Sequence, residues 1–279
     1  MKSVSNPARS DANGETAMRS LRQVAAAQPL IHHLTSAVVA NDVANVTLAF
    51  GARPVMAEAP EEVAEITAAV RALVLNLGML SPTKIEAMRI AGRAAATKGI
   101  PIVLDPVGAG ATSLRTATAL RLLADLPVAV VRGNRGELGA LVGMGAASGV
   151  DAIGAEEPEP IARAVAARFG VVAAVTGAVD VVVDNGAVYQ VCNGHALLTR
   201  ITGSGCMASA AIGIFLTAGA NTAVQTALAL AVYGVAAERA AAPVGGEAIP
   251  GPGTFRARLL DAVAALATTG IDGLRITVR

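Results

Sequence analysis

Short runs of β-branched and other apolar residues alternate along the chain with longer, alanine-rich segments that are compatible with helices. The runs span Leu73 to Gly78, Pro101 to Asp105, Val128 to Val131 and Val171 to Gly177, and Asn185-Gly186 then separates two further short runs as in a hairpin. Alternating strands and helices are typical of βαβ units, in which helices cover both faces of a parallel sheet. Strands that are apolar throughout fit burial on both sides. The pattern therefore predicts an α/β fold with a mostly parallel central sheet.

The first residues, "MKSVSNPARSDANGETAMRS", differ in character from the rest of the chain. They are polar and lack the apolar core of a secretion signal, so we interpret residues 1–18 as a flexible N-terminal arm. No internal repeat, low-complexity linker or break in composition divides the remaining residues. We therefore expect a single domain over residues 19–279.

Composition and charge exclude some classes of function. The 279 residues are 53% hydrophobic and 15% charged with a net charge of +1, which lacks the basic excess that binding to nucleic-acid phosphates requires. Only 2% of residues are aromatic and none is Trp, so stacking platforms for bases are missing as well. Two cysteines without zinc-ligand spacing indicate a reducing, cytoplasmic location.

The most apolar region, Met207 to Ala242, resembles a membrane span at first sight. It is interrupted by "TAGANTAVQT", and it consists mostly of Ala in place of Leu and Ile. We therefore expect buried helices of a soluble protein here, and no contact with a membrane.

Each predicted strand ends in polar or glycine residues. Because the carboxyl ends of parallel strands line the ligand crevice of an open sheet, these residues should converge in space. They are Asn76, Gly78, Asp105, Arg132, Thr176 and Gly177.

The stretch "RITGSGCMASAAIGIF" contains a glycine turn, Gly203-Ser204-Gly205, that leads directly into an apolar helix. A helix N-terminus with bare N–H groups suits an anion, most simply a phosphate. The alternative is an ordinary strand-to-helix turn whose glycines serve only its geometry. A P-loop is excluded because none of the lysines, which are Lys2, Lys84 and Lys98, follows these glycines. The match of "GSGCMA" to a dinucleotide fingerprint lacks the strand and acidic residue that should follow, so we treat it as accidental.

Two further strand ends carry charged residues. In "VLDPVGAGAT", Asp105 can hold Mg²⁺ or its waters, or it can simply cap the loop. In "VVRGNRGEL", Arg132 suits phosphate recognition and Glu137 opens the next helix, although a surface ion pair between them would explain both residues.

Cysteines and histidines are the remaining candidates for chemistry. Cys206 fits a small buried hydrophobe, a metal ligand or a reactive group, and its place in a first helical turn should lower the pKa of its thiol. Cys192 lies in a predicted edge strand, where we favour ordinary packing. His32 and His33 are adjacent, so at most one should face the core side of a strand. We treat both, and His195, as non-catalytic.

Taken together, these motifs resemble those of the hydroxyethylthiazole kinase family. The resemblance runs from about residue 30 to about residue 270 and rests on "GARPVMAEAPEEV", "LVLNLGMLS", "DPVGAGAT", "VVRGNRGEL", "VTGAVD" and "TRITGSGCMAS", in this order. It implies a ribokinase-like three-layer sandwich and ATP-dependent phosphorylation of 4-methyl-5-(2-hydroxyethyl)thiazole in thiamine biosynthesis or salvage. It also implies Mg²⁺ and a homotrimer with its active sites between subunits.

The resemblance assigns roles to residues on both sides of the reaction. Met56 and Gly203 match the family's contacts to the thiazole. Arg132 and Thr176 match its contacts to ATP.

Other matches concern the metal, the proton and specificity. Asp105 and Glu137 match acidic positions near magnesium and the triphosphate, and Cys206 takes the place of the catalytic Asp of sugar-kinase relatives. The chain departs from the family at Ser36, where Asn is usual, and at Met79, where Thr is usual. Both positions lie near the expected substrate end, where a lost amide or hydroxyl partner can change specificity.

Two other classes of function stay open beside this resemblance. One is another ribokinase-like kinase, or an ATP-dependent hydro-lyase, that acts on a different small substrate. The other is a non-catalytic sensor of the thiazole or of a nucleotide. A degenerate enzyme would be expected to lose some of the residues above, and all of them are present.

Overall fold

The computed structural model describes residues 7–144, 157–184 and 186–279, and these residues form one nine-stranded sheet in the order β2-β1-β3-β4-β5-β6-β7-β8-β9. The strands β2, β1, β3, β4, β5 and β6 are parallel, and β7, β8 and β9 continue the sheet in antiparallel pairing. Their bounds are β1 Leu30–Leu34, β2 Arg53–Val55, β3 Ala72–Asn76, β4 Ile102–Asp105, β5 Val128–Asn134, β6 Val172–Thr176, β7 Asp180–Val183, β8 Val188–Val191 and β9 Ile276–Val278. The mostly parallel sheet and the hairpin between β7 and β8 are confirmed, while Asn185 itself lies outside the described residues.

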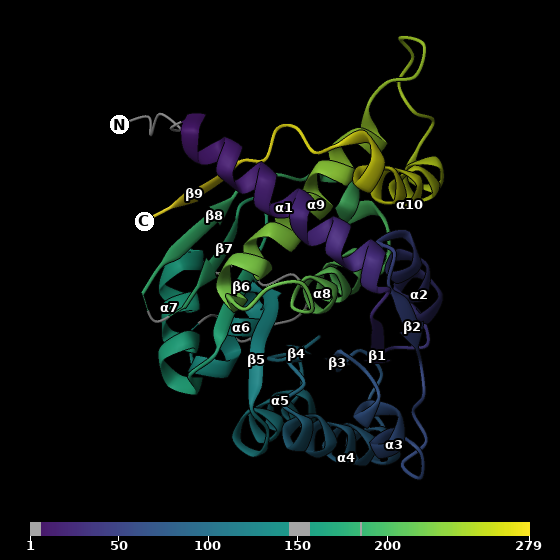
Figure 1. Cartoon of the computed structure of the whole chain (residues 1–279). Coiled ribbons are helices and arrows are strands. Elements are labelled where there is room, and N and C mark those ends of the chain that lie inside the picture. Colours follow the sequence, from purple (N-terminus) through teal and green to yellow (C-terminus); the bar gives the residue numbers. More distant parts are fainter. Residues whose placement is uncertain (1–6, 145–156, 185) are drawn as a thin grey trace.

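Helices cover both faces of this sheet and complete a three-layer sandwich (Figure 1). One face packs against α1 Pro7–Ala27, α2 Ala40–Ala49, α8 Ser204–Phe215, α9 Thr222–Ala241 and α10 Pro252–Thr269. The other packs against α3 Val63–Ala68, α4 Pro82–Lys98, α5 Ser113–Asp125, α6 Arg135–Val142 and α7 Pro158–Phe169. A short 3₁₀ helix, Ala196–Arg200, precedes the glycine turn. Alternate residues of the central strands, such as Leu73, Val74 and Leu75 of β3, supply the two apolar cores, as the period of a strand requires.

Local sequence sets the ends of several helices. Helix α4 begins after Ser81, whose hydroxyl accepts a hydrogen bond from the N–H of Lys84, and it ends at Gly99 with φ +64°. Helix α9 begins after Asn221, which caps the N–H of Val224. These are ordinary N-cap residues and an ordinary left-handed glycine C-cap.

The expected flexible arm over residues 1–18 is wrong where it overlaps α1. That helix places Ala17, Leu21 and Val24 on one face, all of them buried against the sheet-covering helices. This spacing of three and four residues is an amphipathic signal that the polar composition of the segment conceals. Residues 1–6 lie outside the described residues.

Burial also overturns two expectations about single residues. Both His32 and His33 are buried, because helices cover the two faces of the sheet toward which neighbouring residues of β1 point. Cys192 is exposed, and β8, which precedes it, is not an edge strand because β9 pairs outside it.

The apolar region from Met207 to Ala242 forms two helices, α8 and α9, that are buried in the same core. In the part of the chain that the structure describes, no helix has the length and apolar character needed to cross a bilayer.

Candidate active site at the carboxyl edge of the sheet

Asp105 is the last residue of β4 and is completely buried. Its Oδ2 accepts hydrogen bonds from Asn76 Nδ2 at 2.8 Å and from the Ser209 hydroxyl at 2.9 Å, while Oδ1 is buried without a hydrogen-bond partner. These bonds reach a neighbouring strand and α8, which does not fit the alternative that Asp105 only caps its own loop. Burial raises the pKa of Asp105 to about 6, although the guanidinium of Arg132 opposes this effect.

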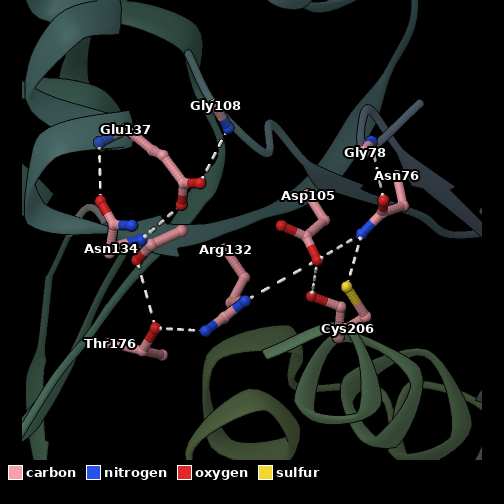
Figure 2. A network of polar contacts seen from close by, with 11 residues as sticks. Asn76, Gly78, Asp105, Gly108, Arg132, Asn134, Glu137, Thr176 and Cys206 are labelled. Carbon is pink, nitrogen blue, oxygen red and sulfur yellow. Dashed lines mark hydrogen bonds and ion pairs between the residues drawn. The ribbon is translucent and has the colours of Figure 1, made fainter. Parts of the chain in front are cut away.

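Cys206 lies in the first turn of α8, with its Sγ 3.2 Å from Asn76 Nδ2 (Figure 2). Burial, and then the charge of Asp105, raise the pKa of the Cys206 thiol to about 12. The expectation of a lowered thiol pKa is therefore wrong. The helix N-terminus and Arg132 favour a thiolate, but loss of solvent and a nearby carboxylate outweigh them.

Arg132 joins the ends of β4, β5 and β6. Its Nη1 lies 3.7 Å from Asp105 Oδ2, and its Nη2 donates to Thr176 Oγ1 at 2.6 Å (Figure 2). The side chain is only 12% exposed, so the alternative of a surface ion pair is wrong. Helix α8 lies close to the guanidinium, because a Cβ placed on Gly205 would be 2.6 Å from Nη1. The anion-binding group of the arginine therefore lies at the start of the helix that follows the glycine turn.

Glu137 holds two loops together. Its Oε2 accepts from the N–H of Asn134 in a capping box at the start of α6, and its Oε1 accepts from the N–H of Gly108 in the loop after β4, both at 2.9 Å. Backbone donors therefore occupy both carboxylate oxygens of this buried side chain. Its place in the first turn of α6 agrees with the expectation that it opens this helix, and its hydrogen-bond partners are backbone N–H groups.

The glycine turn needs its first glycine for geometry and for space. Gly203 has φ +85°, and a Cβ there would lie 2.8 Å from Cγ1 of Val39. As the N-cap of α8 it provides no side chain to bond the first N–H groups of the helix. These donors, on Ser204 and Gly205 and in the rest of the first turn, suit an anion next to Arg132.

The residues expected near the thiazole substrate follow the neighbouring strands. Met56 follows β2, is half-buried, and packs against the same core as Cys206. Ser36 follows β1, is buried, and accepts a hydrogen bond from the N–H of Val38. Met79, after β3, is 49% exposed.

Two residues of this site received no role from the sequence. Asn76 was noted only as a polar strand end, yet its amide contacts both Asp105 and Cys206. Ser209 is three residues beyond Cys206, so the two share a helix face, and this spacing was the available signal.

The buried histidines hold structural hydrogen bonds instead. His32 contacts the Thr67 hydroxyl at 2.8 Å and the carbonyl of Ala57 at 2.7 Å, and His33 contacts the Thr47 hydroxyl at 3.1 Å. Over the described ranges, no three His, Cys, Asp or Glu side chains gather as they would around a protein-held metal ion.

Comparisons with known proteins agree with this geometry. The model of the hydroxyethylthiazole kinase family matches residues 21–269. A hydroxyethylthiazole kinase from Desulforudis audaxviator is 49% identical over 259 residues, covering 92% of this chain and 93% of the relative. The solved structure of a hydroxyethylthiazole kinase protein from Pyrococcus horikoshii is 37% identical, covers 95% of this chain and 99% of its own, and superposes with a TM-score of 0.83.

A more distant structure supports the fold alone. A ribokinase-like superfamily protein from Enterococcus faecalis is 12% identical and superposes with a TM-score of 0.62 over 85% of this chain and 87% of its own. The expected ribokinase-like sandwich is therefore confirmed. With the family model matching most of its length and relatives near half-identity, the chain belongs to the hydroxyethylthiazole kinase family.

Proposed function

We propose that this protein transfers the γ-phosphoryl group of ATP to the hydroxyl of 4-methyl-5-(2-hydroxyethyl)thiazole. The observation that carries the proposal is the meeting of Asp105, Arg132 and Cys206 at the start of α8, directly after the glycine turn. Phosphoryl transfer depends mainly on positioning and on stabilising spread negative charge. A buried arginine, an uncapped helix N-terminus and a free carboxylate oxygen are suited to that task.

In this proposal, ATP binds at the carboxyl ends of β5 and β6. The guanidinium of Arg132, fixed by Thr176, faces the phosphates, and the N–H groups of Ser204 and Gly205 bind the phosphoryl group in transit. Because Thr176 also donates to the carbonyl of Gly133, at 3.3 Å, its hydroxyl is held in place to orient the arginine.

Magnesium fits the residues that are present. The buried, unpartnered Oδ1 of Asp105 is a hard oxygen ligand of the kind that Mg²⁺ prefers, and Glu137 lies beside the same loop. When bound with ATP, the cation neutralises charge on the phosphates. Asp105 would hold it directly or through water.

Cys206 is the residue that we place beside the attacking hydroxyl. A thiol whose pKa is about 12 stays protonated in the free protein at neutral pH, so a preformed thiolate base is not available. We expect the substrate proton to leave late, when the oxygen has begun to bond to phosphorus and is more acidic, and to pass to an oxygen of the transferred phosphoryl group. Cys206 then contributes to rate by its contact with the attacking hydroxyl, without being indispensable.

The thiazole would bind toward β1 and β2, with Met56 and Gly203 in contact with it. Family resemblance further supports a homotrimer with shared sites and a cytoplasmic location. Sedimentation tests the trimer, since a stable and fully active monomer would contradict it.

The decisive experiment measures ATP consumption and phosphorylated product, with magnesium, for the thiazole alcohol and a panel of other small alcohols. Preference for the thiazole supports the proposal and makes Ser36 and Met79 neutral variation. Preference for another alcohol keeps the kinase and changes its substrate. ATP binding without turnover on any alcohol would favour a sensor.

A further inference from the structure

Arg115 binds the backbone of two loops at once. It lies in the first turn of α5 and is partly buried, and its guanidinium donates to the carbonyl oxygens of Leu77 at 2.6 Å, Gly78 at 2.8 Å and Val107 at 2.8 Å. A cation in the first turn of a helix opposes the helix dipole, so α5 itself gains nothing from this charge. The planar, forked guanidinium is suited to hold carbonyls of separate segments together.

One of the peptide groups that it holds is fixed at both ends. Arg115 donates to the C=O of the Leu77–Gly78 peptide, and the N–H of the same peptide donates to Oδ1 of Asn76 at 2.9 Å. Both ends of the peptide plane are therefore bonded, and its rotation would break two hydrogen bonds together. The orientation of this peptide depends directly on Arg115.

That peptide in turn decides which way the amide of Asn76 points (Figure 2). A backbone N–H can only donate, so the atom of Asn76 that faces Gly78 must be the carbonyl oxygen. The NH₂ group then faces the opposite direction, where it donates to Asp105 Oδ2 and Cys206 Sγ. A reversed amide would set its oxygen against the carboxylate of Asp105.

The second loop is held in the same manner. Arg115 donates to the C=O of the Val107–Gly108 peptide, and the N–H of that peptide donates to Glu137 Oε1. The side chain of Arg115 also lies against Gly108, where a Cβ would be 2.9 Å from Arg115 Cδ. The loops that follow β3 and β4 are thus joined through one side chain.

We propose that Arg115 is a positioning residue for phosphoryl transfer, which orients Asn76, and through it Asp105 and Cys206, by fixing the Leu77–Gly78 peptide. This inference rests on the proposed function for its kinetic consequence, and on the hydrogen bonds above for its geometry. Arg115 acts through Asn76 and touches no reacting atom.

A double-mutant cycle tests the route through Asn76. We expect Arg115→Ala to lower kcat by about 10²-fold, the order of loss that a small misplacement of reacting groups causes, with a much smaller change in KM. If the two residues act in series, Arg115→Ala/Asn76→Ala matches Asn76→Ala within about a factor of two. Multiplied losses of the two single variants would overturn the proposal. Arg121→Ala, an exposed arginine on the same helix, is the matched control and should keep wild-type kcat.

Arg115→Lys separates positioning from folding. Lysine keeps the charge but cannot hold three carbonyls in a plane, so we expect a folded protein with a lowered kcat. It replaces Arg115→Ala in the cycle if that variant does not fold. Wild-type kcat in Arg115→Lys would overturn the proposal.

A readout without turnover distinguishes this inference from the proposed function. The alkylation rate of Cys206 is measured in a Cys192→Ser background, so that a single thiol reports. We expect Arg115→Ala to change this rate measurably, by at most the factor that Asn76→Ala does, and the double variant to match Asn76→Ala. If the wild-type chain phosphorylated no alcohol, this coupling would still support the inference while the proposed function failed. An unchanged alkylation rate in Arg115→Ala would overturn the inference even in an active kinase.

Discussion

The Nη1 atom of Arg132 lies 3.7 Å from Oδ2 of Asp105, so the ends of β4 and β5 carry opposite charges that face each other in a buried site. The carboxylate nonetheless keeps a raised pKa, because the arginine compensates only part of its lost hydration. This balance has a measurable effect on both stability and activity.

Asp105→Asn should make the protein more stable and much less active. Burial raises the pKa of Asp105 from 3.8 to about 6, so the folded chain binds its proton more tightly than the unfolded chain. The contribution of this group to the free energy of unfolding therefore falls as the pH rises through that interval. In urea unfolding, the free energy of unfolding of the variant should exceed that of wild type by roughly 3 kcal/mol at pH 8 and by less at pH 5. We expect kcat to fall by about 10²–10³-fold.

The exposed residue Asp261 supplies the control, since Asp261→Asn should change neither the free energy of unfolding at either pH nor kcat. Equal stability of Asp105→Asn and wild type at both pH values would show that the carboxylate carries no burial cost.

Gly205→Ala should displace Arg132 selectively. A Cβ at this position would meet Nη1 at 2.6 Å and Nη2 at 2.9 Å, and no left-handed φ is involved, so the helix itself tolerates alanine. We expect KM for ATP to rise by about 10-fold or more, as for loss of a hydrogen bond to a charged group, with little change in melting temperature. Gly253→Ala is matched, because it is also the second residue of a helix and has open space around it. Unchanged KM in Gly205→Ala would remove Arg132 from the ATP site.

Cys206 should resist alkylation although it lies in the first turn of a helix. Burial and the charge of Asp105 raise its pKa to about 12, whereas Cys192 is exposed. Treatment of the folded protein with iodoacetamide at pH 8, followed by mass spectrometry, should modify Cys192 first and Cys206 only slowly. Equal rates for the two thiols would contradict the raised pKa. Urea-unfolded protein, in which both are exposed, is the control.

Replacement of Cys206 by Ala or Ser should weaken turnover without abolishing it. The glycine turn, Arg132 and Asp105 remain in place in these variants and supply most of the charge stabilisation. We expect kcat to fall by at most about 10²-fold, the order of loss that a small misplacement of reacting groups causes. Steady-state kinetics decide the matter, and wild-type kcat in Cys206→Ala would deny the residue any catalytic role.

His33→Gln should flatten the dependence of stability on pH in mild acid. Burial, with His32 beside it, lowers the pKa of His33 to about 3, so the unfolded chain takes up a proton below pH 6.5 that the folded chain refuses. Wild-type stability should therefore fall with decreasing pH, with a slope from this group that steepens below pH 6.5 toward about 1.4 kcal/mol per pH unit. Urea titrations from pH 7 to 5 measure the slope. The exposed His195 gives the control variant, His195→Gln, and an equally steep slope in His33→Gln would refute the assignment.

The fold followed from the sequence where the signal was local. Apolar runs located β3, β4, β5 and β6, and the rule for parallel strands brought Asp105, Arg132 and Thr176 to one edge. Helix α1 was missed because its buried positions, such as Leu21, are few among polar neighbours.

The chemistry of the site depended on contacts that no local pattern contains. A helix N-terminus predicted a lowered thiol pKa for Cys206, but the opposing effects come from burial and from Asp105, which lies about a hundred residues earlier in the chain. Likewise, the family resemblance matched Glu137 to an acidic position near magnesium. Its partners, the N–H groups of Asn134 and Gly108, became visible only with the loops in place.

The use of both Glu137 oxygens by backbone donors has a consequence for the order in which reactants bind. With that carboxylate engaged, Asp105 Oδ1 is the buried carboxylate oxygen of the described site that is left without a partner, and one protein ligand is too few to retain a strongly hydrated ion. We therefore expect the cation to enter as the companion of the nucleotide, with free magnesium governing the reaction through the fraction of ATP that it complexes.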